Sequence, residues 1–290
     1  MRVIWAIDAI GESALLLERA AEFLRRLVSR TPLEIEPVSV LEGIRQEAGI
    51  EDRLLSDEQA LPGLKRSLDS LMLEFEDLRE HLLPSVVLGG SSFSAAKRLA
   101  QHASSHNADL ILCSTHARSG VQRLLIGSFA EELLKVAQTP VNIVRVRPIP
   151  EPNRTLYWTD FKETSAKEFR KVVRACKQLG TTLSVFHCPQ YPMEPILQSG
   201  TYLLSGAQPV LHRITSPRLF RLERRGLAWA RWAEHQGVEC EFILDERPGN
   251  PVAQFLELLQ SKSIGIAFVS KPPRLREILR KAPCPVWVIR

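Results

Sequence analysis

A polar loop between two apolar runs holds the residues whose types and spacing best suit chemistry in this chain. Residues 110–113 form an apolar run of strand character, residues 114–120 are polar, and a helical pattern opens at Gly127-Ser128. A helix that starts shortly after a parallel strand presents free backbone N–H groups and the positive end of its dipole to a ligand. Arg118 adds a guanidinium that suits a bidentate contact with phosphate. The pattern therefore predicts a site for an anion, above all for a phosphate group.

Two polar residues near this site also have a simpler interpretation. Ser128-x-x-Glu131 is a capping box, in which the serine hydroxyl satisfies the first N–H groups of the helix rather than a ligand. Asp8 closes the first apolar run, where its carboxylate equally suits the turn around Gly11. The sequence alone leaves both interpretations open for each residue.

Other chemically active side chains form weaker patterns. His102 and His106 stand four positions apart on a predicted helix, which is a metal-binding spacing, but no third ligand is evident. A solvated helix face is the favoured interpretation, and no metal site is predicted. His187 and Cys188 are neighbours in a predicted strand, so their side chains point to opposite faces and do not form a nucleophile pair. No catalytic residue is assigned.

The charge pattern limits the classes of partner. The net charge of +5 is compatible with acidic partners but does not require nucleic acid. An arginine-rich helix over residues 218–231 is interrupted by Glu223, while Trp229 and Trp232 indicate packing, so nucleic acid is disfavoured. No apolar run reaches the roughly 18 residues that a membrane span needs. The five cysteines are scattered without a CxxC pair, which favours reduced thiols in the cytoplasm.

The elements that must position the loop alternate between strands and amphipathic helices in both halves of the chain. Strands are predicted over residues 2–8, 33–40, 86–88, 110–114, 141–146, 154–160, 182–188, 241–244, 266–270 and 285–289. Helices are predicted over residues 13–28, 64–83, 94–106, 164–179 and 250–259, besides the arginine-rich helix. Gly180 suits a helix stop, and Asn250-Pro251 suits a helix start. This alternation predicts parallel strands joined by right-handed crossovers.

The chain reads as an imperfect duplication. Residues 2–8 (RVIWAID) and 154–160 (RTLYWTD) share an Arg-to-Asp spacing, and a proline-rich segment over residues 147–152 separates the halves. We expect an α/β fold with two tandem Rossmann-like domains, 1–147 and 154–290. Each domain is expected to be a roughly five-stranded parallel sheet with helices on both faces.

The loop of the first half resembles the nucleotide loop of the universal stress protein family. ATP-binding members carry Gly-x2-Gly-x9-Gly-Ser/Thr, and the same frame here is Ser114-x2-Ala117-x9-Gly127-Ser128. The resemblance implies an adenine nucleotide α-hydrolase-like fold, a role in the stress response, and ATP with Mg²⁺ in the first half. The residues that it implies at the nucleotide are Asp8, Val40, Ser114, Thr115, Ala117, Arg118, Gly127 and Ser128.

Departures from the family pattern leave a second function open. Alanine at residue 117 disfavours the positive φ that glycine adopts, and its methyl group hinders the close approach of the backbone to a phosphate. The second half has 15 positions from Ser270 to Pro285, where the first has 26 from Ser114 to Pro140, so we expect a degenerate second domain without the phosphate loop. The alternative is an interaction scaffold with an unknown protein partner and no nucleotide. Turnover is not expected beyond slow ATP hydrolysis.

The resemblance also implies how the halves assemble. Family members often dimerise through their final strands, which correspond here to residues 141–146 and 286–289. A duplicated chain can make this contact internally, as an intramolecular pseudo-dimer, because pairing covers two sheet edges at once. Pairing between chains, as a homodimer, is the alternative.

Overall fold

The computed structural model describes residues 1–9, 12–40, 57–89, 94–114, 128–145, 147–162, 164–189, 217–270 and 274–290. The strands are β1 (Arg2–Ala6), β2 (Glu34–Val40), β3 (Val86–Leu88), β4 (Leu110–Ser114), β5 (Val141–Val144), β6 (Arg154–Trp158), β7 (Thr182–His187), β8 (Cys240–Leu244), β9 (Ile266–Val269) and β10 (Val286–Val288). The helices are α1 (Ala14–Val28), α2 (Asp57–Met72), α3 (Ala95–Ser105), α4 (Ser128–Val136), α5 (Ser165–Leu179), α8 (Pro217–His235), α9 (Pro251–Ser261) and α10 (Leu275–Lys281), with a 3-10 helix η1 (Glu76–His81).

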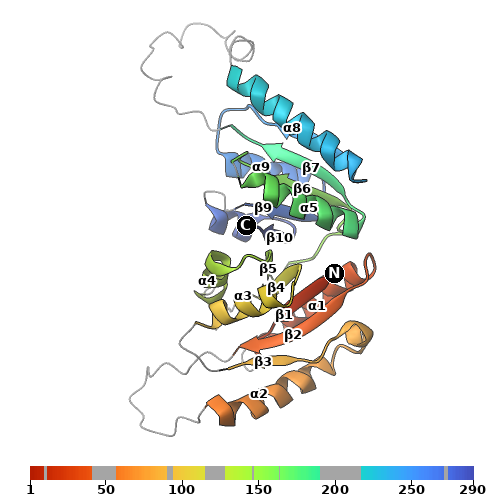
Figure 1. Cartoon of the computed structure of the whole chain (residues 1–290), viewed down its shortest axis with the longest axis vertical. Helices are drawn as coiled ribbons and strands as arrows, with labels where there is room; N and C mark the ends of the chain where they lie inside the picture. The colour runs from red at the N-terminus through yellow and green to blue at the C-terminus, as the bar shows by residue number, and fades with distance from the viewer. Residues whose placement is uncertain are drawn as a thin grey trace.

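The strands form one sheet of ten in the order β3-β2-β1-β4-β5-β10-β9-β6-β7-β8. Figure 1 shows the first-half strands on one side of β5 and β10 and the second-half strands on the other. Every pair is parallel except β5–β10. The predicted α/β class is therefore confirmed. The halves contribute adjacent blocks of strands and do not interleave, and their strand orders match, as a duplication requires.

Helices cover both faces of the sheet, which confirms the predicted layering. One face packs against α1, α2, α5 and α8 around Trp5, Leu24 and Trp287. The other face packs against α3, α4, α9 and α10 around Ile4, Ile111 and Phe255. Because helices cover both faces, as is characteristic of parallel sheets, every residue of β4 and β9 is buried.

Helix ends follow the predicted signals in the second half. Gly180 ends α5 in the left-handed conformation at φ 62°, which favours glycine. The Asn250 side chain accepts a hydrogen bond from the Val252 N–H at 3.0 Å and starts α9.

The prediction of a single helix over residues 64–83 is wrong. The α-helix ends at Met72, and Phe75, at φ −110° and ψ 57°, precedes the separate helix η1. Apolar residues spaced by three or four positions suit both kinds of helix, so the pattern did not reveal the break.

The two halves meet at the antiparallel pair β5–β10, where Asn142 lies opposite Trp287 and Val141 opposite Val288. The final strands thus pair within the chain, as expected for a pseudo-dimer. Arg145, directly after β5, donates hydrogen bonds to the carbonyl oxygens of Leu279 at 2.6 Å and Cys284 at 2.8 Å. Burial, with a smaller effect of Arg147, lowers the pKa of Arg145 to about 10, so the guanidinium stays charged at neutral pH.

We expect Arg145→Met to destabilise the chain by about 2 kcal/mol, because a charged donor is removed from two carbonyl oxygens of the other half. Urea denaturation of the full chain measures this loss. Arg147→Met is the matched control, since Arg147 is exposed and its hydrogen bonds to Lys281 and Ala282 are both 3.1 Å long. Equal losses in the two variants would contradict the role assigned to Arg145.

All five cysteines are buried and free. Burial raises the pKa of Cys113, Cys240 and Cys284 to about 12, so their thiols are unreactive at neutral pH.

Among the described residues, no helix combines the length and apolar character needed to cross a membrane.

Candidate functional site

Three strands of the first half bring three of the expected site residues, Asp8, Val40 and Ser114, to one edge of the sheet. The register of β1 and β2 pairs Ala6 with Val38, and the Ile7 N–H donates to the Val38 carbonyl oxygen at 2.9 Å. Asp8 therefore follows β1 at the level where Val40 ends β2. Ser114 ends β4, the neighbour of β1 on its other side. The carboxyl ends of parallel strands are where ligands bind in such folds.

The helix that completes this edge is α4, which starts at Ser128, and its first turn carries Glu131. The helix is placed as the anion-site hypothesis requires, since it connects β4 to the adjacent parallel strand β5. The other four predicted nucleotide residues, Thr115, Ala117, Arg118 and Gly127, lie outside the described residues. The choice between capping box and ligand contact at Ser128 also stays a prediction.

A buried carboxyl group that the sequence did not single out lies at the same edge. Glu12 folds back on the end of β1, where its Oε2 accepts a hydrogen bond from the Asp8 N–H at 3.0 Å. Burial raises the pKa of Glu12 to about 7, and the negative charge of Asp8 adds to the rise, while the Ser114 hydroxyl nearby opposes it. An acidic residue just before an amphipathic helix was the available signal, but such a residue is usually solvated.

The hydrogen bonding of Glu12 and Ser114 is incomplete. In the described part of the chain, Glu12 Oε1 and Ser114 Oγ are both buried and neither makes a hydrogen bond of good geometry. The Ser114 hydroxyl is still close enough to lower the pKa of the Glu12 carboxyl, so the two groups are near neighbours. Buried polar atoms are normally paired, so this edge has polar groups free to contact a ligand.

The equivalent edge of the second half is internally satisfied. Ser270, which follows β9 as Ser114 ends β4, donates its hydroxyl to Glu168 Oε2 at 2.6 Å. Asp160, the counterpart of Asp8, accepts hydrogen bonds from the Lys162 N–H and the Ser165 hydroxyl, each at 3.0 Å. The carboxylate of Asp160 thus has the turn-capping role that the simpler interpretation gave to Asp8.

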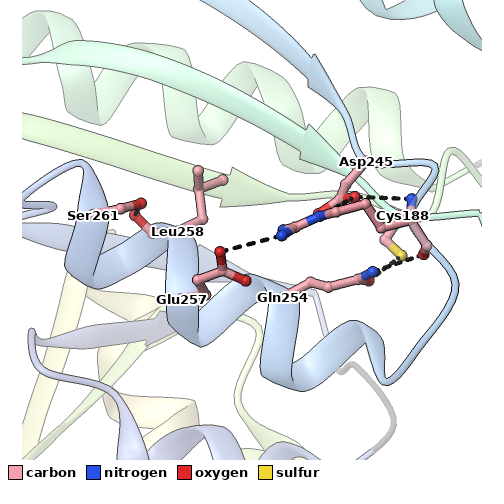
Figure 2. A network of polar contacts seen from close by, with 7 residues as sticks. Cys188, Asp245, Gln254, Glu257, Leu258 and Ser261 are labelled. Atoms are coloured by element: carbon pink, nitrogen blue, oxygen red, sulfur yellow. Dashed lines mark hydrogen bonds and ion pairs between the residues drawn. The ribbon is translucent and has the colours of Figure 1, made fainter.

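A second network fills the adjoining part of that edge (Figure 2). The Arg247 guanidinium donates to Asp245 Oδ2 at 2.7 Å and to Glu257 Oε1 at 3.2 Å. Gln254 accepts a hydrogen bond from the Cys188 thiol at 2.8 Å and donates to the Arg247 carbonyl oxygen at 2.7 Å. These side chains bind one another across the ends of β7 and β8 and the helix α9, so the exposed Arg247 guanidinium is paired with two carboxylates.

The structure separates His187 from Cys188, as predicted. The His187 ring is hydrogen-bonded to the Thr159 carbonyl oxygen at 2.8 Å, whereas the Cys188 thiol is bonded to Gln254. On the arginine-rich helix α8, Trp229 stacks on Phe169 with ring centroids 4.5 Å apart, which confirms a packing role. Trp232 is more exposed than the prediction implied, at 38%.

The expectation that His102 and His106 lack a third ligand is corrected by the structure. Glu36 of β2 is buried and lies with its Oε1 atom 3.1 Å from His102 Nε2. Burial lowers the pKa of His102, although Glu36 opposes this effect. Glu36 is 66 positions from His102 in the sequence, so only the packing of α3 on β2 brings them together.

Comparison with known proteins identifies the fold and the family. No curated protein matches the chain. The structure is similar to a universal stress protein from Archaeoglobus fulgidus, with 14% identity, a TM-score of 0.59, and coverage of 100% of this chain and 96% of that chain. It is similar to a protein from Pseudomonas aeruginosa assigned to the same class, with 11% identity, a TM-score of 0.55, and coverage of 99% and 92%.

A shorter match is to an Archaeoglobus fulgidus universal stress protein in complex with dAMP, with 14% identity, a TM-score of 0.34, and coverage of 47% of this chain and 97% of that chain. The model of the universal stress protein family itself matches residues 1–145 of the sequence, which contain Asp8, Val40, Ser114 and the loop to Ser128. This chain therefore belongs to the universal stress protein family.

Proposed function

We propose that this protein is a cytoplasmic stress-response module that binds an adenine nucleotide in its first domain only. The domains are assigned to residues 1–147 and 154–290. The adenosine lies between Asp8 and Val40, and the phosphates lie against Ser114 and the start of α4. The loop residues that complete the phosphate site are Thr115, Ala117, Arg118, Gly127 and Ser128.

The observation that carries this proposal is the contrast between Ser114 and Ser270. Ser114 Oγ is buried without a hydrogen bond in the described part of the first half, whereas Ser270 Oγ is bonded to Glu168 at 2.6 Å. An unpaired buried hydroxyl costs about 1–3 kcal/mol, and a phosphate oxygen or a ribose hydroxyl removes that cost by accepting or donating a hydrogen bond. The first half thus has the unfilled polar edge.

Charge at this edge explains why we propose ATP as its magnesium complex. Asp8 and Glu12 place two carboxyl groups near the end of β1. A polyphosphate without its cation meets repulsion there, and Mg²⁺ reduces the negative charge that the phosphates present. The N-terminus of α4 contributes positive potential, and the sequence adds the cationic side chain of Arg118 in the loop before it.

For the second domain we propose that no nucleotide binds. Asp160, Ser270 and Arg247 are each held by neighbouring side chains at the edge where a nucleotide would lie. A ligand must break these hydrogen bonds before it forms its own, which offsets the gain in binding free energy. The short segment after β9 supports the same proposal, since it has no glycine at residues 271–274.

Calorimetric titration of the full chain with ATP and Mg²⁺ tests the proposal. We expect weak binding by the wild-type chain at one site. Ala117→Gly is expected to tighten it about fivefold or more, because glycine adopts the positive φ that the family pattern implies here at about 1 kcal/mol less cost than alanine. Gly127→Val is expected to abolish binding by blocking the approach of the phosphates to the backbone.

Gly63→Ala serves as the control, since Gly63 lies in α2 and a methyl group there meets nothing within 4 Å. If neither the wild-type chain nor Ala117→Gly gives heat at millimolar ATP and Mg²⁺, the nucleotide proposal is wrong. The family fold would then act as an interaction scaffold for a protein partner. Two equivalent sites per chain would contradict the proposed loss of function in the second domain.

A further inference from the structure

A second group of ligand-type side chains lies away from the proposed nucleotide edge. Glu36 is the third residue of β2, opposite Ile4 of β1, whereas the nucleotide edge is at Val40. His102 is in the last turn of α3, and His106 is the residue that directly follows this helix. The chain runs back along α3 before it enters β4, so the end of α3 lies towards the amino ends of the strands.

The three side chains converge closely. One ligand atom from each of Glu36, His102 and His106 lies within 4.8 Å of the other two. The Glu36 Oε1 and His102 Nε2 atoms are 3.1 Å apart, and the two imidazole rings have centroids 4.1 Å apart. Glu36 is only 4% exposed, so its carboxylate is held in place rather than free in solvent.

Neighbouring groups orient these ligands as metal sites require. The other carboxylate oxygen of Glu36, Oε2, accepts a hydrogen bond from the Arg2 guanidinium at 2.7 Å, which leaves Oε1 directed at His102. His106 Nδ1 is 2.9 Å from the His102 carbonyl oxygen, an acceptor that fixes the proton on Nδ1. The lone pair of His106 is therefore on Nε2. Hydrogen bonds of this kind to the far side of a ligand are typical of metal-bound histidine and carboxylate.

We propose that Glu36, His102 and His106 form a binding site for a divalent transition-metal ion, with Zn²⁺ as the ion that they fit best. Two imidazole nitrogens and one carboxylate oxygen are ligands that Zn²⁺ accepts in tetrahedral geometry, with water as the fourth. Metal–ligand bonds of about 2.1 Å place neighbouring ligand atoms roughly 3.4 Å apart. Glu36 and His102 are close to this spacing at 3.1 Å, and the exposed His106, whose ligand atom lies within 4.8 Å of theirs, must move closer to complete the site.

The site would connect two elements of the first domain. A bound ion joins the end of α3 to β2, the strand whose Val38 side chain packs in the same cluster as α3 on one face of the sheet. At its other end, α3 contacts α4 through Ser94, whose hydroxyl donates to Glu132 Oε1 at 2.6 Å. Zn²⁺ is thus expected to stabilise the packing of α3 without occupying the nucleotide edge.

Isothermal titration of the tag-free, metal-stripped full chain with Zn²⁺, together with thermal unfolding, tests the proposal. We expect one ion per chain and a melting temperature that rises with Zn²⁺ concentration. His106→Ala should weaken binding at least about tenfold, because loss of an outer partner alone typically costs 10- to 100-fold. Since His106 is exposed, this variant should fold as the wild type does. Co²⁺ should give the intense visible absorption of a tetrahedral site in the wild type and lose it in His106→Ala.

His235→Ala is the matched control, because His235 is an exposed histidine at the end of a helix, α8, in the other half. Its affinity for Zn²⁺ should equal that of the wild type. Equal binding by wild type and His106→Ala would place the ion elsewhere and overturn the proposal. The proposal would also be overturned if about 100 µM Zn²⁺ gave neither binding nor a thermal shift. Arg2, Glu36 and His102 would then form a purely structural ion-pair network.

Discussion

Replacing Gly265 by alanine is expected to destabilise the chain by roughly 3 kcal/mol or more. Gly265 is buried at the start of β9, where a Cβ atom would lie 2.1 Å from the Glu151 carbonyl oxygen and 2.6 Å from Pro152 Cα. Both atoms belong to the backbone of the segment that leads into β6, so no side-chain rotation relieves the clash. The Gly265 N–H also donates to the Arg154 carbonyl oxygen at 2.9 Å, which ties the two segments together.

Urea or thermal unfolding of Gly265→Ala and the wild type measures this loss. The matched control is Gly63→Ala in α2, where the added methyl group meets nothing within 4 Å. That change is expected to stabilise the chain by about 0.5–1 kcal/mol, because alanine is the better helix former. A Gly265→Ala variant as stable as the wild type would show that the linker before β6 can move away from β9 at no cost.

The sequence predicted the strands well where a short apolar run is bounded by polar or turn residues. The predicted ranges for β3 and β4 agree with the structure, since short apolar runs such as 86–88 and 110–113 have few alternatives in an alternating pattern. The close approach of Gly265 to Glu151 was not predictable, because it depends on how the linker crosses the start of β9. The break between α2 and η1 was missed because Phe75 and Leu78 keep a helical spacing across it.

The candidate sites show the same limit. The family resemblance implied that Asp8, Val40 and Ser114 lie near one ligand, and parallel strands bring their carboxyl ends together in any such sheet. The contribution of Glu12 required its side chain to fold back on β1, and that of Glu36 required α3 to pack on β2. Both are acidic residues with an unremarkable local sequence, and their burial is decided by tertiary structure.

Glu12 is expected to make the protein less stable as the pH rises from about 5 to 8. Its pKa is raised from 4.5 to about 7 in the folded chain, chiefly by burial. Between pH 4.5 and about 7, the Glu12 carboxyl therefore keeps its proton in the folded state but has lost it in the unfolded state. Stability falls as the pH rises through this window and is constant, for this group, above it. The whole shift corresponds to about 3 kcal/mol.

Replacing Glu12 by glutamine should remove this dependence, since an amide of the same shape stays neutral at every pH. We expect Glu12→Gln to be more stable than the wild type by up to about 3 kcal/mol at pH 8. The difference should shrink towards zero near pH 5, where the wild-type carboxyl is protonated in the folded chain. Free energies of unfolding from urea titrations at several pH values give this difference directly, because all other titrating groups are common to both proteins.

Glu22→Gln provides a control with the opposite sign. Although burial opposes it, hydrogen bonds from Arg19 and Arg26 lower the pKa of Glu22, so its charge stabilises the folded chain above pH 4.5. Glu22→Gln should therefore be less stable than the wild type at pH 8 and approach it as the pH falls. A Glu12→Gln variant that behaves in the same way as Glu22→Gln would mean that Glu12 is ionised in the folded protein. The end of β1 would then carry two negative charges at neutral pH, and nucleotide phosphates would need Mg²⁺ there even more strongly.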